Sequence, residues 1–189
     1  MKYFYVSHRT QDTFIKGLKE KLSYHILYTY KLIKKNNNKQ WGFFLFDKGK
    51  LIGYTQADYT KERKINILYI IQVYLDEEYR GKKLCNELLK RTIIKHEQNK
   101  GKPNLIKITY AEGMSMLKCS LRSFKELDYK IKIYQNQYEM IMSNKKINNI
   151  NFDTEEDIKK LKNISYKKVI EIEMKNKKYD IWYSLFFYK

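Results

Sequence analysis

Four consecutive residues, Arg80, Gly81, Lys82 and Lys83, place positive charge and a glycine directly before a segment with the hydrophobic pattern of a helix. The first turn of a helix has backbone N–H groups without partners and a partial positive charge, so it favours an anion. The cationic side chains add full charges, and Gly81 has no Cβ that would hold a ligand away from the backbone. This combination predicts a site for a phosphate or pyrophosphate group.

A strand and a helix must position this site. Residues 67–75 are β-branched and aromatic, which predicts a strand, and an acidic turn at residues 76–78 follows. Beyond the basic cluster, apolar or small side chains recur on one face of a predicted helix while charged residues take the other face. The residues on the apolar face are Leu84, Cys85, Leu88, Leu89, Thr92 and Ile93.

The common nucleotide fingerprints G-x-x-x-x-G-K-[ST] and G-x-G-x-x-G are absent from the sequence. The order of hydrophobic strand, Tyr-Arg-Gly-Lys and amphipathic helix resembles motif A of the GNAT family of acetyl-coenzyme A dependent N-acyltransferases. That motif reads roughly Val-x-Pro-x-Tyr-Arg-Gly-x-Gly-hydrophobic-Gly/Ala, and residues 75–85 occupy its register. The resemblance implies that the coenzyme A pyrophosphate binds the backbone between Arg80 and Cys85, which assigns acetyl-CoA binding to Arg80, Gly81, Lys82, Lys83, Leu84 and Cys85.

Three departures from the family pattern matter for the site. Lys83 stands at the glycine two positions after Gly81 and Cys85 at the glycine or alanine, which indicates a variant site in which Lys83 can add charge and Cys85 is still small. In the family's second motif, which in many members ends Tyr-x-x-x-Gly-Phe, Phe124 replaces the tyrosine that commonly protonates the departing thiolate. The alternative interpretation of residues 67–97 is an ordinary strand, turn and helix with a solvated basic face.

Acyl transfer to an amine requires the neutral amine, and a lysine-like amine with a pKa near 10.4 is disfavoured at pH 7 by roughly 4 to 5 kcal/mol. A positioned carboxylate relieves this cost. The first candidate for this base is Glu112, which follows a strand predicted over residues 105–110, and the second is Asp76. Both could instead be solvated turn carboxylates. Ser120 is a candidate proton donor to the thiolate.

The GNAT resemblance also implies where the acyl group lies. In that family the fourth and fifth strands splay apart, which here falls near Val73, Tyr74 and Leu75. Their backbone groups would hold the pantetheine arm and polarise the thioester carbonyl.

The predicted elements belong to the α/β (α+β) class, with a GNAT-like, mixed and mostly antiparallel central sheet and flanking helices. We expect a GNAT-like acyl-CoA-binding domain over residues 1–143 and an extension over residues 144–189 that packs on it or on a partner. The extension contains a predicted helix from Asp153 and a β-hairpin over residues 170–188. Residues 23–33 could form either a helix or a strand. The hairpin could extend the sheet or pair with another subunit, so both a monomer and a homodimer are compatible with the sequence.

The 189 residues include 39 Lys and Arg against 21 Asp and Glu, a formal charge of +18. This balance suggests nucleic acid or anionic surfaces as partners, or simply solvated faces in a chain rich in Lys, Asn, Ile and Tyr. Cys85 and Cys119 form no C-x-x-C pair and the histidines are isolated, so we expect no metal site and free cysteines in a reducing, cytoplasmic compartment. The apolar runs are too short to span a bilayer.

Three functions remain open from the sequence. The first is an N-acetyltransferase that uses acetyl-CoA and acts on an amine of a small molecule or peptide. The second is a catalytically degenerate GNAT-fold module, as Lys83, Cys85 and Phe124 suggest. The third is a basic nucleic-acid-binding protein with tyrosines for stacking.

Overall fold

The computed structural model describes residues 1–11, 24–35, 39–62, 65–111, 116–137, 162–167 and 181–188. In these residues one sheet has the strand order β1-β2-β3-β4-β5-β8-β6-β7. Its strands are β1 (Lys2–Ser7), β2 (Gln40–Asp47), β3 (Lys50–Glu62), β4 (Ile65–Leu75), β5 (Leu105–Ala111), β6 (Lys130–Gln137), β7 (Lys162–Asn163) and β8 (Ile181–Tyr188). The helices are α2 (Tyr24–Lys35), α3 (Leu84–Lys100) and α4 (Met116–Glu126).

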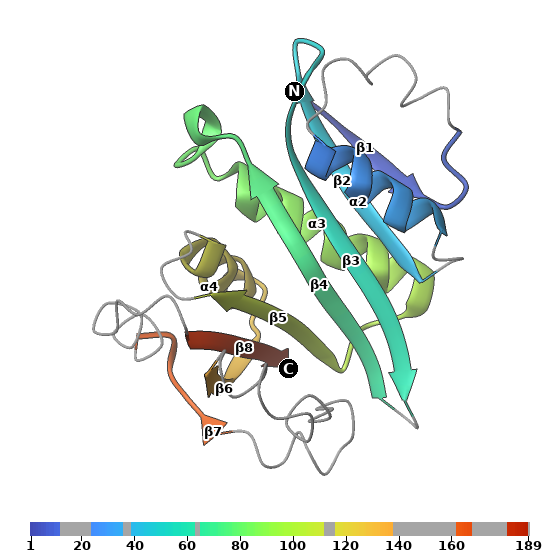
Figure 1. Cartoon of the computed structure of the whole chain (residues 1–189). Coiled ribbons are helices and arrows are strands. Elements are labelled where there is room, and N and C mark those ends of the chain that lie inside the picture. Colours follow the sequence, from blue (N-terminus) through green and yellow to red (C-terminus); the bar gives the residue numbers. More distant parts are fainter. Residues whose placement is uncertain are drawn as a thin grey trace.

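The pairing in this sheet confirms the predicted mixed, mostly antiparallel architecture. Only β4 and β5 pair in parallel among the described strands. Helix α2 covers β1 and β2 on one face, and α3 crosses behind β2, β3 and β4 on the other (Figure 1). The segment for which the sequence left helix and strand open is therefore helical, in α2.

Each face of the sheet has its own core. On the α2 face, Ile33 packs with Val6, Phe44 and Tyr54. On the other face, α3 and α4 share a larger cluster whose members include Leu89, Ile93, Leu121, Phe124 and Phe187. Successive side chains of each strand point to opposite faces, so the same strands supply both cores with different residues, as the pleated geometry requires.

The last described strand lies inside the sheet. β8 pairs with β5 on one side and with β6 on the other, both antiparallel. Phe187 is fully buried, and its ring stacks on that of Phe124 with 3.9 Å between centroids. The aromatic strand predicted near the C-terminus thus extends the sheet of the same chain. The first strand of the predicted hairpin, at residues 170–174, and the predicted helix from Asp153 lie outside the described residues.

Among the residues that the structure describes, no helix is both long and apolar enough to cross a membrane.

Candidate active site

Strands β4 and β5 separate where the predicted acyl site lies. They pair only from Ile67 with Leu105 to Ile70 with Ile108, although β4 continues to Leu75. The register between β3 and β4 shifts at the same level, where Ile71 is an extra residue in β4. Such a bulge bends and twists its strand. The backbone of residues 71–75 therefore has no β5 partner, which is the opening that the GNAT resemblance implies.

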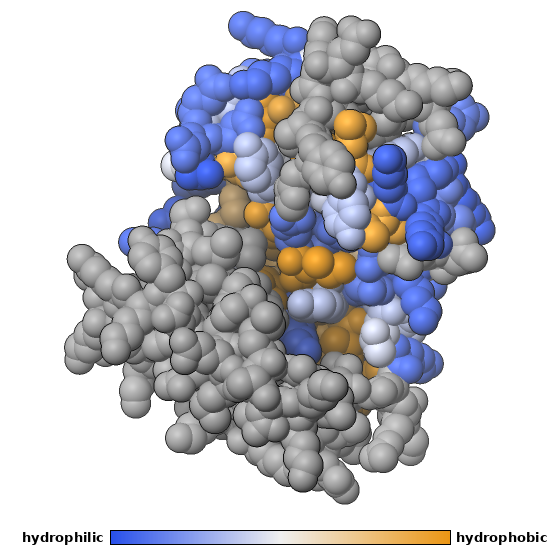
Figure 2. All heavy atoms as spheres, in the orientation of Figure 1, coloured by the Kyte–Doolittle hydropathy of each residue, from blue (hydrophilic) through white to orange (hydrophobic). Residues whose placement is uncertain are grey.

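The side chains of residues 73–75 alternate across the opening. Leu75 is buried against Leu88 of α3, and Val73 packs on the core beneath α3 and α4. Tyr74 points to the α2 face, where its ring stacks on Tyr54 at 5.6 Å between centroids. The Tyr74 side chain is 37% exposed. Figure 2 shows this face of the molecule, on which hydrophobic residues lie between hydrophilic ones. The outer end of β4 is therefore accessible from this face.

The turn between β4 and α3 is closed by Arg80. Its Nε donates to the carbonyl oxygen of Leu75 at 3.2 Å, and its Nη1 pairs with Glu77 at 3.1 Å. The sequence suggested that Arg80 adds charge to the anion site, and this stays a prediction; in the structure its guanidinium also holds the turn. The free charges at the start of α3 are Lys82 and Lys83, both exposed, and the Lys82 ammonium lies 5.0 Å from the centre of the Tyr79 ring.

The backbone at the start of α3 is arranged for close approach. Gly81 has φ +78°, and a Cβ there would meet no atom within 4 Å, so the space beside it is open. Lys83 precedes the first helical residue with φ 60° and ψ 7°, and its side chain does not cap the helix. Its carbonyl oxygen accepts from the Glu87 N–H at 3.2 Å. The first-turn N–H groups of α3 therefore face outward without a side-chain cap from Lys83.

The left-handed backbone of Lys83 explains why glycine is the family residue at this position. We expect Lys83→Gly to raise the free energy of unfolding by up to about 1 kcal/mol, because strain of about 1–2 kcal/mol is relieved while glycine costs about 0.5–1 kcal/mol of chain entropy. Lys82→Gly is the matched control, since Lys82 is also exposed but has no positive φ. Urea denaturation of both variants tests this, and equal destabilisation would contradict it.

Helix α3 is fastened to α4 beside the basic turn. The structure joins Cys85 and Cys119 in a disulfide, so the expectation of free cysteines is wrong. Cys85 lies in the helix predicted after the basic turn, but nothing in the sequence showed that this helix packs beside α4, which carries Cys119. Next to the disulfide, Asn86 donates to Glu126 at 3.0 Å and accepts from Ser123. Asn86 had no sequence signal, because its role depends on this contact.

Asp76 lies at the outer end of β4 in a network that the sequence did not reveal. Its carboxylate accepts from the Tyr74 hydroxyl at 2.8 Å and pairs with Lys50 at 3.1 Å. The hydrogen bond to Asp76 raises the pKa of Tyr74, and hydrogen bonds to Glu78 and Asp76 raise that of Lys50. Both oxygens of Asp76 thus have a donor, one from Tyr74 and one from Lys50.

The other predicted catalytic residues have different positions. Ser120 is 1% exposed on the buried face of α4. Phe124, a side chain with no proton to give, is fully buried in the same helix. Glu112 directly follows β5 in the sequence but lies outside the described residues, so its role stays a prediction.

Comparison with known proteins agrees with this geometry. The sequence model of the Acetyltransferase (GNAT) family matches residues 5–112. A comparison with curated proteins gives no match. Among solved structures, the diaminobutyrate acetyltransferase EctA from Paenibacillus lautus is similar with a TM-score of 0.52 and 18% identity, covering 74% of this chain and 85% of that one.

A second solved structure, NAA60 from Arabidopsis thaliana in complex with a bisubstrate analogue, has a TM-score of 0.45 and 10% identity, covering 72% of this chain and 88% of that one. The family match spans the separation of β4 and β5, the basic turn and all of α3. The family model matches this chain across motif A, and the chain has the mixed sheet described above. This chain belongs to the GNAT family of acetyltransferases.

Proposed function

We propose that this protein is an N-acetyltransferase that transfers the acetyl group of acetyl-CoA to the amine of a small molecule or peptide. The observation that carries the proposal is the juxtaposition of two features: the uncapped start of α3 and the adjacent separation of β4 from β5. The start of α3 suits a pyrophosphate group. The separation of β4 from β5 suits an extended ligand chain that pairs with the strand backbone. No feature of the described residues identifies the acceptor amine.

The residues at the start of α3 fit the pyrophosphate of coenzyme A. The open space beside Gly81 admits an oxygen close to the backbone, and the outward N–H groups of residues 83–86 supply donors. Lys82 and Lys83 add charge beside that of Arg80, which also holds the turn. Cys85 contributes its backbone only, since its sulfur is bonded to Cys119.

The opening beside β4 fits the rest of the donor. Residues 73–75 have backbone groups that no β5 residue occupies, although the Leu75 carbonyl oxygen already accepts from Arg80, so this segment can pair with an amide-bearing arm as a strand would. Acetyl-CoA supplies the activated thioester there. A backbone N–H aimed at its carbonyl oxygen would stabilise the charge that develops during transfer.

Proton removal from the amine is assigned first to Glu112 and second to Asp76. We expect Glu112→Gln to lower turnover by roughly tenfold to 100-fold at pH 7 and much less at pH 9, because an amine with a pKa near 10.4 loses its proton more readily at high pH. Turnover measured from pH 6.5 to 9.5 tests this. Asp76→Asn is the matched variant, and a pH-dependent loss in Asp76→Asn alone would transfer the role to Asp76.

The decisive experiment for the proposed function has two stages. Calorimetry with acetyl-CoA should show binding, and mass spectrometry of a panel of polyamines, amino acids and peptides incubated with the protein and acetyl-CoA should show one acetylated product. Binding without any product would support the degenerate GNAT module. Absence of binding would contradict the proposal itself.

A further inference from the structure

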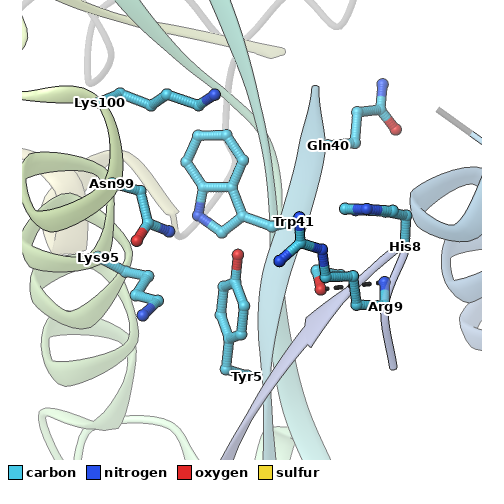
Figure 3. Close-up of a pocket in the computed structure, with 9 residues that line it drawn as sticks. Tyr5, His8, Arg9, Gln40, Trp41, Lys95, Asn99 and Lys100 are labelled. Atoms are coloured by element: carbon cyan, nitrogen blue, oxygen red, sulfur yellow. Dashed lines mark hydrogen bonds between the residues drawn. The ribbon is translucent and has the colours of Figure 1, made fainter. Parts of the chain in front are cut away.

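A concave site lies at the C-terminal end of α3, away from the basic turn at its start. It is a pocket of about 390 Å³ between the end of β1, the start of β2 and the last turns of α3. Tyr5 and Trp41 come from the two strands, whereas Lys95, Asn99 and Lys100 come from the helix. Figure 3 shows the Trp41 indole in the middle, with the α3 side chains on one side and Arg9 on the other.

The pocket is strongly basic. Arg9, Lys95 and Lys100 line it, and no Asp or Glu does. Within the described parts of the chain, none of these three cations forms a salt bridge. The Lys95 ammonium lies 4.9 Å from the centre of the Tyr5 ring, and that of Lys100 lies 5.0 Å from the Tyr59 ring. Three positive charges therefore meet here without a neutralising carboxylate in the lining.

Asp58, an acidic side chain that contacts the lining, is already engaged. Gln40 donates to Asp58 at 3.3 Å and accepts from Gln56 at 3.0 Å. Asp58 also accepts from the backbone N–H of Tyr59 at 2.6 Å. This carboxylate is thus held by the strands next to the pocket rather than by its cations.

A buried donor without a partner also lines the pocket. Trp41 is only 5% exposed, and no hydrogen-bond acceptor in the described residues contacts its Nε1. An indole N–H can only donate, and leaving a buried donor unsatisfied is unfavourable. One face of the Trp41 ring stacks on His96 at 5.7 Å between centroids. Burial lowers the pKa of His96 to about 4, so this histidine is neutral near pH 7 and adds no charge.

The lining is also held in position. The Nζ of Lys34 donates to the carbonyl oxygen of His8 at 2.9 Å and to that of Thr10, on either side of Arg9. The Arg9 N–H donates to Ser7 Oγ at 3.3 Å (Figure 3). Burial raises the pKa of Tyr5, so its hydroxyl stays protonated and can donate. Several donors from separate elements thus converge on one cavity before any ligand binds.

This pocket is separate from the proposed acetyl-CoA site. From Leu84 to Asn99 the axis of α3 rises about 22 Å. Trp41 lies level with Ile70 of β4 through the pairing with Ala57, and from Ile70 to Leu75 the strand advances about 16 Å. A ligand in this pocket would not compete for the start of α3.

We propose that this pocket binds a small molecule that carries a phosphate or pyrophosphate group. Three converging cations favour a ligand with more than one negative charge, and the Trp41 N–H supplies a directed donor. A pocket of this size suits a small ligand, whereas a nucleic-acid backbone would follow an extended groove. The inference is independent of acetyl transfer.

The test uses inorganic pyrophosphate and the indole N–H signal of Trp41 in the full-length, ¹⁵N-labelled protein, assigned by its loss in Trp41→Phe. We expect a saturable shift of this signal, and Lys95→Gln should weaken binding by roughly tenfold through loss of one charged contact. Arg91→Gln is the matched control, since Arg91 lies on the same helix over the Tyr3 ring, outside the pocket. It should change the Kd by less than about twofold.

Two further arms separate this pocket from other anion sites. Gly81→Glu, which disables the proposed acetyl-CoA site, should leave the Trp41 titration unchanged. If Lys95→Gln and Arg91→Gln weaken pyrophosphate binding equally, the effect comes from general surface charge, and the proposal is overturned. A shift of the Trp41 signal with a short single-stranded oligonucleotide but not with pyrophosphate would also overturn it and assign the face to nucleic acid.

Discussion

Gly81→Glu should abolish measurable acetyl-CoA binding, with a Kd at least about 100-fold higher than that of the unchanged protein. The glutamate side chain would fill the open space beside residue 81 and place a negative charge where the pyrophosphate is expected. Two like charges about 5 Å apart repel by roughly 3 kcal/mol near a protein surface, which corresponds to this loss. Calorimetry with acetyl-CoA measures the effect directly.

Backbone strain must be separated from loss of the site, because Gly81 has φ +78°. Gly101, at the other end of α3, provides the matched control: it has φ +81° and equally open surroundings. Gly101→Glu introduces the same side chain at a position of positive φ, and with ψ 173° its backbone is in a region that is essentially restricted to glycine, so strain is present there too. We expect both variants to be destabilised and only Gly81→Glu to lose acetyl-CoA. Equal affinity of the two variants would contradict the site at the start of α3.

Much of this region could be predicted from sequence because its determinants are local. The strand, the acidic turn, Gly81 and the helix follow one another within residues 67–97, and each has its own pattern of side chains. The role of Arg80 could not be predicted, since its contact with the Leu75 carbonyl depends on the three-dimensional path of the turn. The same holds for Asp76, whose partner Lys50 comes from the β2–β3 hairpin.

The order of the strands within the sheet also could not be predicted from sequence patterns. The aromatic segment near the C-terminus was identified as a strand, but its alternation cannot show which strands flank it. Its insertion between β5 and β6 follows from long-range packing, such as the stack of Phe187 on Phe124. The pocket beside Trp41 was missed for a similar reason, because Arg9, Trp41 and Lys95 are far apart in the sequence.

The disulfide between Cys85 and Cys119 should make a large contribution to stability. It links residues 34 positions apart, and closing a loop of that length in the unfolded chain is worth about 3–4 kcal/mol in the chain-entropy account. We therefore expect Cys85→Ser/Cys119→Ser to lower the free energy of unfolding by about that amount, a large share of a typical total of about 5–15 kcal/mol. Urea denaturation without reductant measures this difference.

The reductant supplies the internal control for this prediction. Dithiothreitol should bring the unchanged protein to the stability of Cys85→Ser/Cys119→Ser and should leave that variant unaffected, since it has no bond to reduce. Asn86 would still join α3 to Ser123 and Glu126 after reduction, so the first turn of α3 should keep its place beside α4. Reduction should therefore change the free energy of acetyl-CoA binding far less than it changes the free energy of unfolding. Free thiols in the untreated protein, or equal stability with and without reductant, would show that the bond does not form in solution.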